Sequence, residues 1–224
     1  LEKGVENIPL VMLTITNIKT GRVSNQVNLT FSDNSYLPFF IDDVVKLGLQ
    51  KNQTIDGEKF SQIISAALFY LGREYTLRQV AISPKTQKII SQKLKLFFQK
   101  TTRKYKHFIG FKTDEIISAI INDLNSKNLL NQDDFVKSFL AKNRRKSTNQ
   151  IKFLLSQKGV DISSLKLDKT NDIDSIKRIL AKKRPTKEFL KDFKAKNNLY
   201  ASLFRQGFDI SDIKAAIDDY LTLQ

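Results

Sequence analysis

The chain has 224 residues, a net charge of +15 from 38 Lys and Arg against 23 Asp and Glu, and no cysteine. Without cysteine it can form neither disulfides nor thiolate metal sites, and it suits a reducing compartment, so we expect it in the cytoplasm. No run of about 18 apolar residues occurs and "LEKGVENIPL" lacks the layout of a signal peptide, so we expect no membrane association.

The first 56 residues predict a small β-sheet. The runs "TITNIKT", "VNLTFS" and "SYLPFFI" are short, rich in β-branched and aromatic residues, and roughly alternating. Asp33-Asn34 tolerates the backbone angles of a tight hairpin, and Pro38 cannot donate to a β-ladder, so the third run should be an edge strand. A short helical turn is expected at "DDVVK", followed by a loop.

Beyond residue 57 the apolar spacing is helical, and three glycines divide this region into repeats. Gly110, Gly159 and Gly207 are 49 and 48 residues apart, and each is followed by an apolar residue. A glycine in this position ends a helix in the left-handed conformation, and the apolar residue packs back onto that helix. We expect the Asp or Ser four residues after each glycine to cap the next helix: Asp114, Ser163 and Ser211.

These features predict a mainly α fold of three tandem three-helix repeats, with a period of about 48 residues and a small N-terminal β-sheet. Repeats this small must stack on their neighbours, so we expect an elongated, curved stack. The expected segments are the β-sheet at 1–56, a first repeat with a basic insertion at 57–126, a second repeat at 127–170 and a third at 171–224.

The positive charge follows the repeats. Residues 1–56 hold 5 basic and 6 acidic side chains, whereas residues 57–224 hold 33 basic and 17 acidic side chains. Three stretches with no acid, residues 75–113, 135–160 and 175–187, hold 10, 7 and 6 Lys and Arg. Such charge attracts polyanions, either nucleic acid or an acidic protein surface. The alternative is that lysine-rich helices only solvate their outer faces.

No catalytic constellation stands out, so we expect neither an enzyme nor a cofactor. The eight glycines lie too far apart for a phosphate-binding loop, and a single histidine excludes a histidine-based metal cluster. The pairs Asp42-Asp43, Asp133-Asp134 and Asp218-Asp219 could serve a metal-dependent nuclease. Carboxylates near predicted helix ends are, however, more typical of capping or solvation.

The segment "RKYKHFIGF" at 103–111 interleaves cations with aromatic residues. This composition is typical of platforms on which single-stranded nucleic acid stacks its bases. The alternative is that Phe108 and Phe111 belong to the core at a helix end.

Three stretches follow a known family pattern: "AALFYLGREYTLRQV", "INDLNSKNLLNQDDFVKSFLAKNRRKSTNQIKFLLSQKGV" and "YASLFRQGFDISDIKAAI". On these motifs the sequence resembles the RecX regulatory proteins, bacterial modulators of the RecA recombinase, over nearly the whole chain. Two features depart from the family pattern. Thr76 and Gly110 are 34 residues apart, which implies a basic insertion at 77–109, and Gln206 stands where an arginine is common.

The resemblance implies a monomeric binding protein that follows the groove of the RecA filament on single-stranded DNA and also contacts double-stranded DNA. It implies inhibition of ATP hydrolysis and strand exchange, and a role in recombination, DNA repair and the SOS response. From charge and repeat position we expect these contacts with RecA or DNA: Arg73, Lys93, Lys104, Lys106, Arg144, Arg145, Lys146, Lys152, Lys182, Lys183, Arg184 and Arg205.

Two alternatives stay open for these residues and for the function. Arg73 or Arg205 could pair with acidic side chains inside the structure instead of contacting a partner. The protein could also be a DNA-binding architectural or regulatory protein that ignores RecA, which would give it DNA affinity with a steep salt dependence.

Overall fold

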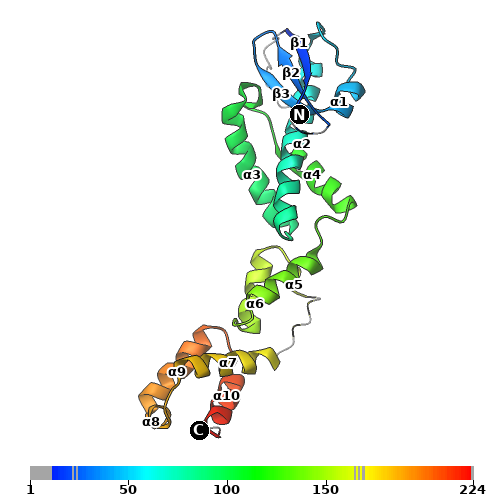
Figure 1. Cartoon of the computed structure of the whole chain (residues 1–224). Coiled ribbons are helices and arrows are strands. Elements are labelled where there is room, and N and C mark those ends of the chain that lie inside the picture. The colour runs from blue at the N-terminus through cyan, green and yellow to red at the C-terminus, as the bar shows by residue number, and fades with distance from the viewer. Residues whose placement is uncertain are drawn as a thin grey trace, which may run out of the picture. The chain divides into compact units, whose positions relative to one another are not determined.

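A computed structural model describes residues 12–222, except Arg22, Ser24, Ser164, Lys166, Asp168 and Lys169 (Figure 1). The chain divides into two units, which we call unit 1 (Leu1–Leu130) and unit 2 (Asn131–Gln224). The described chain is mainly helical with a small N-terminal antiparallel sheet, as the sequence predicts. In the described part, no helix has the length and apolar character needed to cross a membrane.

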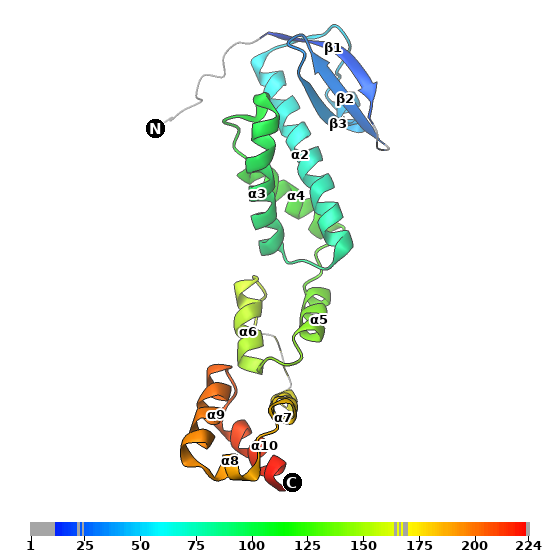
Figure 2. The same ribbon diagram turned by 60° about the vertical axis from the view of Figure 1, so that its left-hand side comes forward.

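Unit 1 contains the sheet and the first helices. Its elements are β1 (Leu13–Thr20), β2 (Gln26–Phe31), β3 (Tyr36–Phe40), α1 (Ile41–Lys46), β4 (Thr54–Ile55), α2 (Gly57–Ile82), α3 (Gln87–Lys104), the 3-10 helix η1 (Lys106–Phe108) and α4 (Asp114–Ser126). In Figures 1 and 2 the sheet lies at one end of α2, and α3 and α4 run beside α2. The insertion at 77–109 therefore lengthens α2 and supplies the whole of α3.

The sheet has the strand order β3-β2-β1-β4, and the paired strands are antiparallel. Pro38 lies on the edge strand β3 opposite Asn28, as its missing N–H predicts. Asn34 has a φ of 61°, which fits the predicted hairpin turn. The two-residue strand β4 was not predicted, because two residues are too short to show an alternating pattern.

The sheet and the helices of unit 1 share one hydrophobic core. Alternate residues of the strands point into it, and the apolar faces of α2, α3 and α4 cover them. Fully buried members include Ile15, Leu29, Phe31, Phe39, Ile63, Leu68, Leu94, Phe98 and Ile120. The β-sheet therefore gains its stability from the first helices, because a small sheet alone buries too little apolar surface.

Gly72 lets α3 and α4 approach α2 closely. A Cβ at this position would lie 2.6 Å from Cδ1 of Ile120 and 2.7 Å from Cζ of Phe98. Gly72→Ala gains up to about 1 kcal/mol of helix propensity, but overpacking costs about 1–3 kcal/mol, so we expect net destabilisation. Thermal melts followed by circular dichroism test this against Gly57→Ala, since a Cβ there meets nothing within 4 Å. A Gly72→Ala protein as stable as Gly57→Ala would contradict the close approach.

A polar cluster ties the β2–β3 hairpin to η1. The Asp33 carboxylate lies 2.8 Å from the Lys106 ammonium and 3.1 Å from Nε2 of His107, and accepts the Ser35 N–H at 2.9 Å. Burial alone would raise the pKa of Asp33, but Lys106 and Ser35 hold that pKa well below its usual range. Burial lowers the pKa of His107, in spite of the attraction of the Asp33 carboxylate.

We expect this cluster to make unit 1 acid-sensitive. Because the folded pKa of Asp33 is depressed, its stabilisation is complete above about pH 4 and is lost as pH falls through the folded pKa. Below about pH 6.5 the unfolded chain also protonates His107 before the folded chain does, which lowers stability further. Thermal melts from about pH 7 to about pH 2 should show a stability difference between the wild type and Asp33→Asn that narrows only below about pH 4. A constant difference between the two proteins over this range would count against the cluster.

Unit 2 is helical throughout its described elements. These are α5 (Gln132–Lys142), α6 (Thr148–Gln157), α7 (Thr170–Lys183), α8 (Lys187–Lys191), α9 (Phe193–Arg205) and α10 (Ile210–Thr222). Helices α7 to α10 surround a second hydrophobic core, whose most buried members are Ile176, Leu180, Leu203, Phe208, Ile213, Ala216 and Ile217. Two helices precede each repeat glycine and one follows it, but α7, which follows Gly159, lies in the segment expected as the third repeat and packs in the core of α8 to α10. The segment boundaries and the curved stack stay predictions.

The repeat glycines have the predicted left-handed backbone. Their φ angles are 80° at Gly110, 81° at Gly159 and 86° at Gly207. The apolar residues after the second and third glycines are buried, with Val160 at 4% and Phe208 at 1% exposure. The sequence repeat therefore marks one recurring joint between helices.

The prediction of the helix caps was wrong, because none of the three predicted residues is the residue that precedes its helix. Asp114 is the first residue of α4, and Ser211 lies inside the first turn of α10. The prediction for Ser163 was wrong, because α7 begins only at Thr170. The N–H and hydroxyl of Ser163 instead donate to the Asp161 carboxylate at 2.9 Å and 2.7 Å. Such local hydrogen bonds compete with helix formation, which fits the later start of α7.

Candidate functional site

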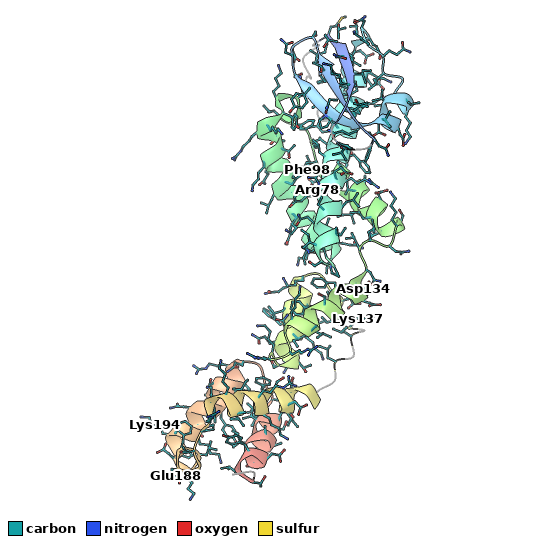
Figure 3. The ribbon with its side chains drawn as sticks, in the orientation of Figure 1. Arg78, Phe98, Asp134, Lys137, Glu188 and Lys194 are labelled. Atoms are coloured by element: carbon teal, nitrogen blue, oxygen red, sulfur yellow. The ribbon has the colours of Figure 1, made fainter. Side chains whose placement is uncertain are left out.

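An open pocket of about 610 Å³ in unit 2 gathers four basic side chains from three segments. Lys137 belongs to α5, Arg144 and Lys146 to the loop between α5 and α6, and Arg178 to α7. Figure 3 shows the labelled side chain of Lys137 on α5. Among the residues that the structure describes, the lining holds twice as many cations as carboxylates, so this part of the pocket favours an anionic partner. We call it the basic pocket.

The sequence of residues 143–146 explains the tight turn between α5 and α6 at the basic pocket. Asn143 closes α5 by donating its side-chain amide to the Phe139 carbonyl at 2.8 Å. The N–H of Lys146 then donates to the Asn143 carbonyl at 3.0 Å, which forms a tight turn. Arg144 and Arg145 occupy the middle of this turn, and both side chains are exposed.

Asp172 holds α7 against this loop. It is only 3% exposed, and its carboxylate accepts the N–H and the hydroxyl of Thr148 at 2.8 Å and 2.9 Å. A carboxylate is favourable there because the first N–H groups of α6 lack partners within the helix. The Ser175 hydroxyl donates to the Arg144 carbonyl at 3.0 Å. These contacts bring Arg178 into the same pocket as Arg144.

The start of α6 is also tied to the turn between α9 and α10. Ser147 caps α6 by accepting the Gln150 N–H at 3.1 Å, and its hydroxyl donates to the Gln206 carbonyl at 2.7 Å. Asn149 donates its side-chain amide to the Gly207 carbonyl at 3.1 Å. The start of α6 is therefore held by α7 on one side and by the turn between α9 and α10 on the other.

The four cations of the basic pocket are Lys137, Arg144, Lys146 and Arg178. Among the side chains that the structure describes, none of these four forms an ion pair. Lys137 and Arg178 were not among the predicted contact residues. They lie in the acid-free stretches 135–160 and 175–187, so charge distribution was the signal that could have found them.

Of the predicted contact residues in unit 1, Arg73 is engaged inside the structure. Its Nε lies 2.9 Å from the Asp123 carboxylate, and its guanidinium lies 5.4 Å from the ring centroid of Phe40. Burial alone would raise the pKa of Asp123, but Lys127 and Arg73 lower it. Arg73 thus joins α2, α4 and β3, which is the alternative that the sequence left open.

The other predicted residues of unit 1 lie on or just after α3. Lys93 is half-buried on α3, whereas Lys104 and Lys106 are exposed. The Lys104 ammonium lies 5.2 Å from the ring centroid of Tyr105. Lys106 is held by Asp33, as described above.

In unit 2 the predicted residues outside the basic pocket lie at two helix ends, on one helix face and, for Arg145, in the turn described above. The cluster at 182–184 is exposed at the end of α7, and Lys183 and Arg184 line another open pocket, of about 600 Å³. Arg205 is exposed in the last turn of α9, and Lys152 is half-buried on α6. Of the predicted residues, only Arg144 and Lys146 line the basic pocket.

The carboxylate pairs do not build a metal site in the described structure. Within residues 12–222, apart from the gaps given above, no three metal-ligating side chains come together. Asp133 and Asp134 lie in the first turn of α5, where Asn131 caps the helix. Asp219 forms an ion pair with Lys177 at 2.8 Å. These acids stabilise helices and their contacts.

Comparison with known proteins finds relatives that share one name, although no family model matches the chain. A regulatory protein RecX of Clostridium perfringens is 31% identical over 163 residues, which cover 72% of this chain and 70% of the relative. One of Clostridium botulinum is 24% identical over 224 residues, covering 95% of this chain and 99% of the relative. A crystal structure of a regulatory protein RecX matches with a TM-score of 0.64 at 15% identity, over 92% of this chain and 100% of that chain.

Proposed function

The chain belongs to the RecX family of regulatory proteins, and we propose that it regulates the RecA recombinase by binding RecA and its filament on single-stranded DNA. In this proposal it inhibits ATP hydrolysis and strand exchange and limits filament assembly during recombination and repair. It acts as a binding protein in the cytoplasm, and the predicted basic residues contact RecA or DNA.

The observation that carries the proposal is the family relationship, and the basic pocket supports it. Four cations with no ion pair among the described side chains surround a pocket large enough for an anionic group. A row of phosphates or an acidic protein surface would neutralise this charge. Repeated helical units would also let one molecule contact several filament subunits, which raises affinity through avidity.

The test is a titration of RecA's ATP hydrolysis on single-stranded DNA with this protein. We compare the wild type with a variant in which Arg144, Arg145 and Lys146 become alanine. A control variant changes three exposed lysines of the N-terminal segment to alanine and removes the same charge: Lys19, Lys46 and Lys51. The proposal expects inhibition well below stoichiometry with RecA, weakened in the first variant and kept in the control.

A RecA-independent DNA-binding protein is the second candidate, favoured by the same basic charge. It would inhibit only at concentrations that coat the DNA, and inhibition would vanish at moderate salt because phosphate contacts are salt-dependent. That result would contradict the proposed binding to RecA and would favour competition for DNA.

A further inference from the structure

Five aromatic side chains of unit 1 gather around an open pocket of about 580 Å³ between β2, β3, α2 and α3. They are Tyr36, Tyr70, Tyr75, Phe97 and Tyr105. The aromatic residues of the segment "RKYKHFIGF" have different surroundings. Phe108 is fully buried in the core, whereas Tyr105 lines the pocket.

The aromatic walls are ordered by contacts between rings. Tyr75 and Phe97 stack with ring centroids 4.4 Å apart and an interplanar angle of 12°. Tyr36 and Tyr105 meet edge to face, with centroids 5.8 Å apart. Tyr36 is 47% exposed, so a large part of its ring is open to a ligand. Exposed, ordered aromatic faces suit a flat π-system such as a nucleobase.

Polar groups in the same pocket can recognise the edge of a base. Gln26 and Asn28 line it from β2, and the Gln26 amide donates to the Asn28 amide oxygen at 3.3 Å. One such bond leaves both amides with further donors and acceptors, and these are the groups that side-chain amides offer to base edges. Burial raises the pKa of Tyr70 and of Tyr105, so their hydroxyls stay neutral and able to donate.

The rim of the pocket is positively charged. Arg78 lines the pocket and is exposed, and Figure 3 labels its side chain on α2. Lys104 is also exposed and lies against the ring of Tyr105. Glu74 is the one acid among the described lining residues. Both cations belong to the acid-free stretch 75–113. Cations around an aromatic pocket match the phosphates on either side of a stacked base.

We propose that this aromatic pocket binds a base of single-stranded DNA, stacked on the exposed ring of Tyr36 with Tyr105 against its edge, and with Arg78 and Lys104 on the neighbouring phosphates. The site goes beyond the proposed function, because it needs no RecA and recognises bases, whereas the basic pocket offers charge alone. A charged or aromatic protein segment is the competing occupant, and the test separates the two.

The experiment measures fluorescence anisotropy with a labelled thymidine 20-mer and with an abasic 20-mer of the same charge, without RecA. We expect the wild type to bind the thymidine oligomer more tightly. Tyr36→Ala combined with Tyr105→Leu should weaken thymidine binding by about tenfold and leave abasic binding unchanged. Phe193→Ala, which removes an 81% exposed ring from unit 2, is the matched control and should change neither affinity.

Arg78→Gln should instead weaken binding to both oligomers equally, because it removes a phosphate contact and no ring. This single surface change keeps the proposal testable if the double tyrosine variant fails to fold. The proposal is overturned if the wild type binds both oligomers equally, or if the tyrosine variant loses affinity for both alike. In that case the pocket is left to a protein segment. RecA inhibition is measured separately, so either proposal can fail while the other stands.

Discussion

Replacing Arg144, Lys146 and Arg178 with glutamine is expected to weaken binding to single-stranded DNA by about a hundredfold at roughly 0.1 M salt. These side chains line one pocket from a loop and from α7. Each phosphate contact with a single strand contributes about 0.7 to the slope of log affinity against log salt. The variant should therefore lose about 2 from this slope.

Glutamine removes the charge of these side chains and leaves a shorter, polar, unbranched side chain in its place. The matched control replaces Lys19, Lys46 and Lys51 with glutamine, which lowers the net charge equally at exposed positions of the N-terminal segment. Affinities are measured by anisotropy across a salt series. Equal losses in the two variants would show that net charge alone attracts DNA and that the basic pocket has no special role.

The parts of the fold that depend on neighbouring residues were predictable from the sequence. The strands show alternation over five to eight residues, and Pro38 marks an edge strand because of its own missing N–H. The repeat glycines need a left-handed backbone, whatever lies around them. The prediction for Ser163 also failed for a local reason, because Ser163 donates to the carboxylate of Asp161, two residues before it, and does not cap a helix.

The sites depend on residues far apart in the chain, and the sequence predicted less of them. Asp172 and Thr148 are 24 residues apart, and no local pattern links a buried carboxylate to the start of another helix. The aromatic pocket draws on two strands and two helices. Charge density did locate the basic stretches, because like charges accumulate in sequence as well as in space. It could not show that Arg73 is held by Asp123.

Gly207→Ala is expected to lower the stability of unit 2 by about 2–3 kcal/mol, more than the same change at Gly110. Both glycines have a left-handed backbone, with φ of 86° and 80°, and alanine there costs about 1–2 kcal/mol. At Gly207 a Cβ would also lie 2.7 Å from Oγ of Ser147, whereas at Gly110 it meets nothing within 4 Å. Ser147 is fully buried and caps α6, so displacing it costs about 1 kcal/mol more.

A double-mutant cycle separates the two costs at Gly207. Ser147→Ala removes the hydroxyl that the new Cβ would meet, so Gly207→Ala should cost only the backbone strain in that background. Hydrogen exchange resolves the two units, because it reports the opening of α6 and α9 separately from α4. If Gly207→Ala costs the same with and without the Ser147 hydroxyl, then close approach is not the reason for glycine there. If the cost falls to that of Gly110→Ala, Gly207 serves two purposes. It turns the chain after α9, and it leaves room for Ser147, which caps α6.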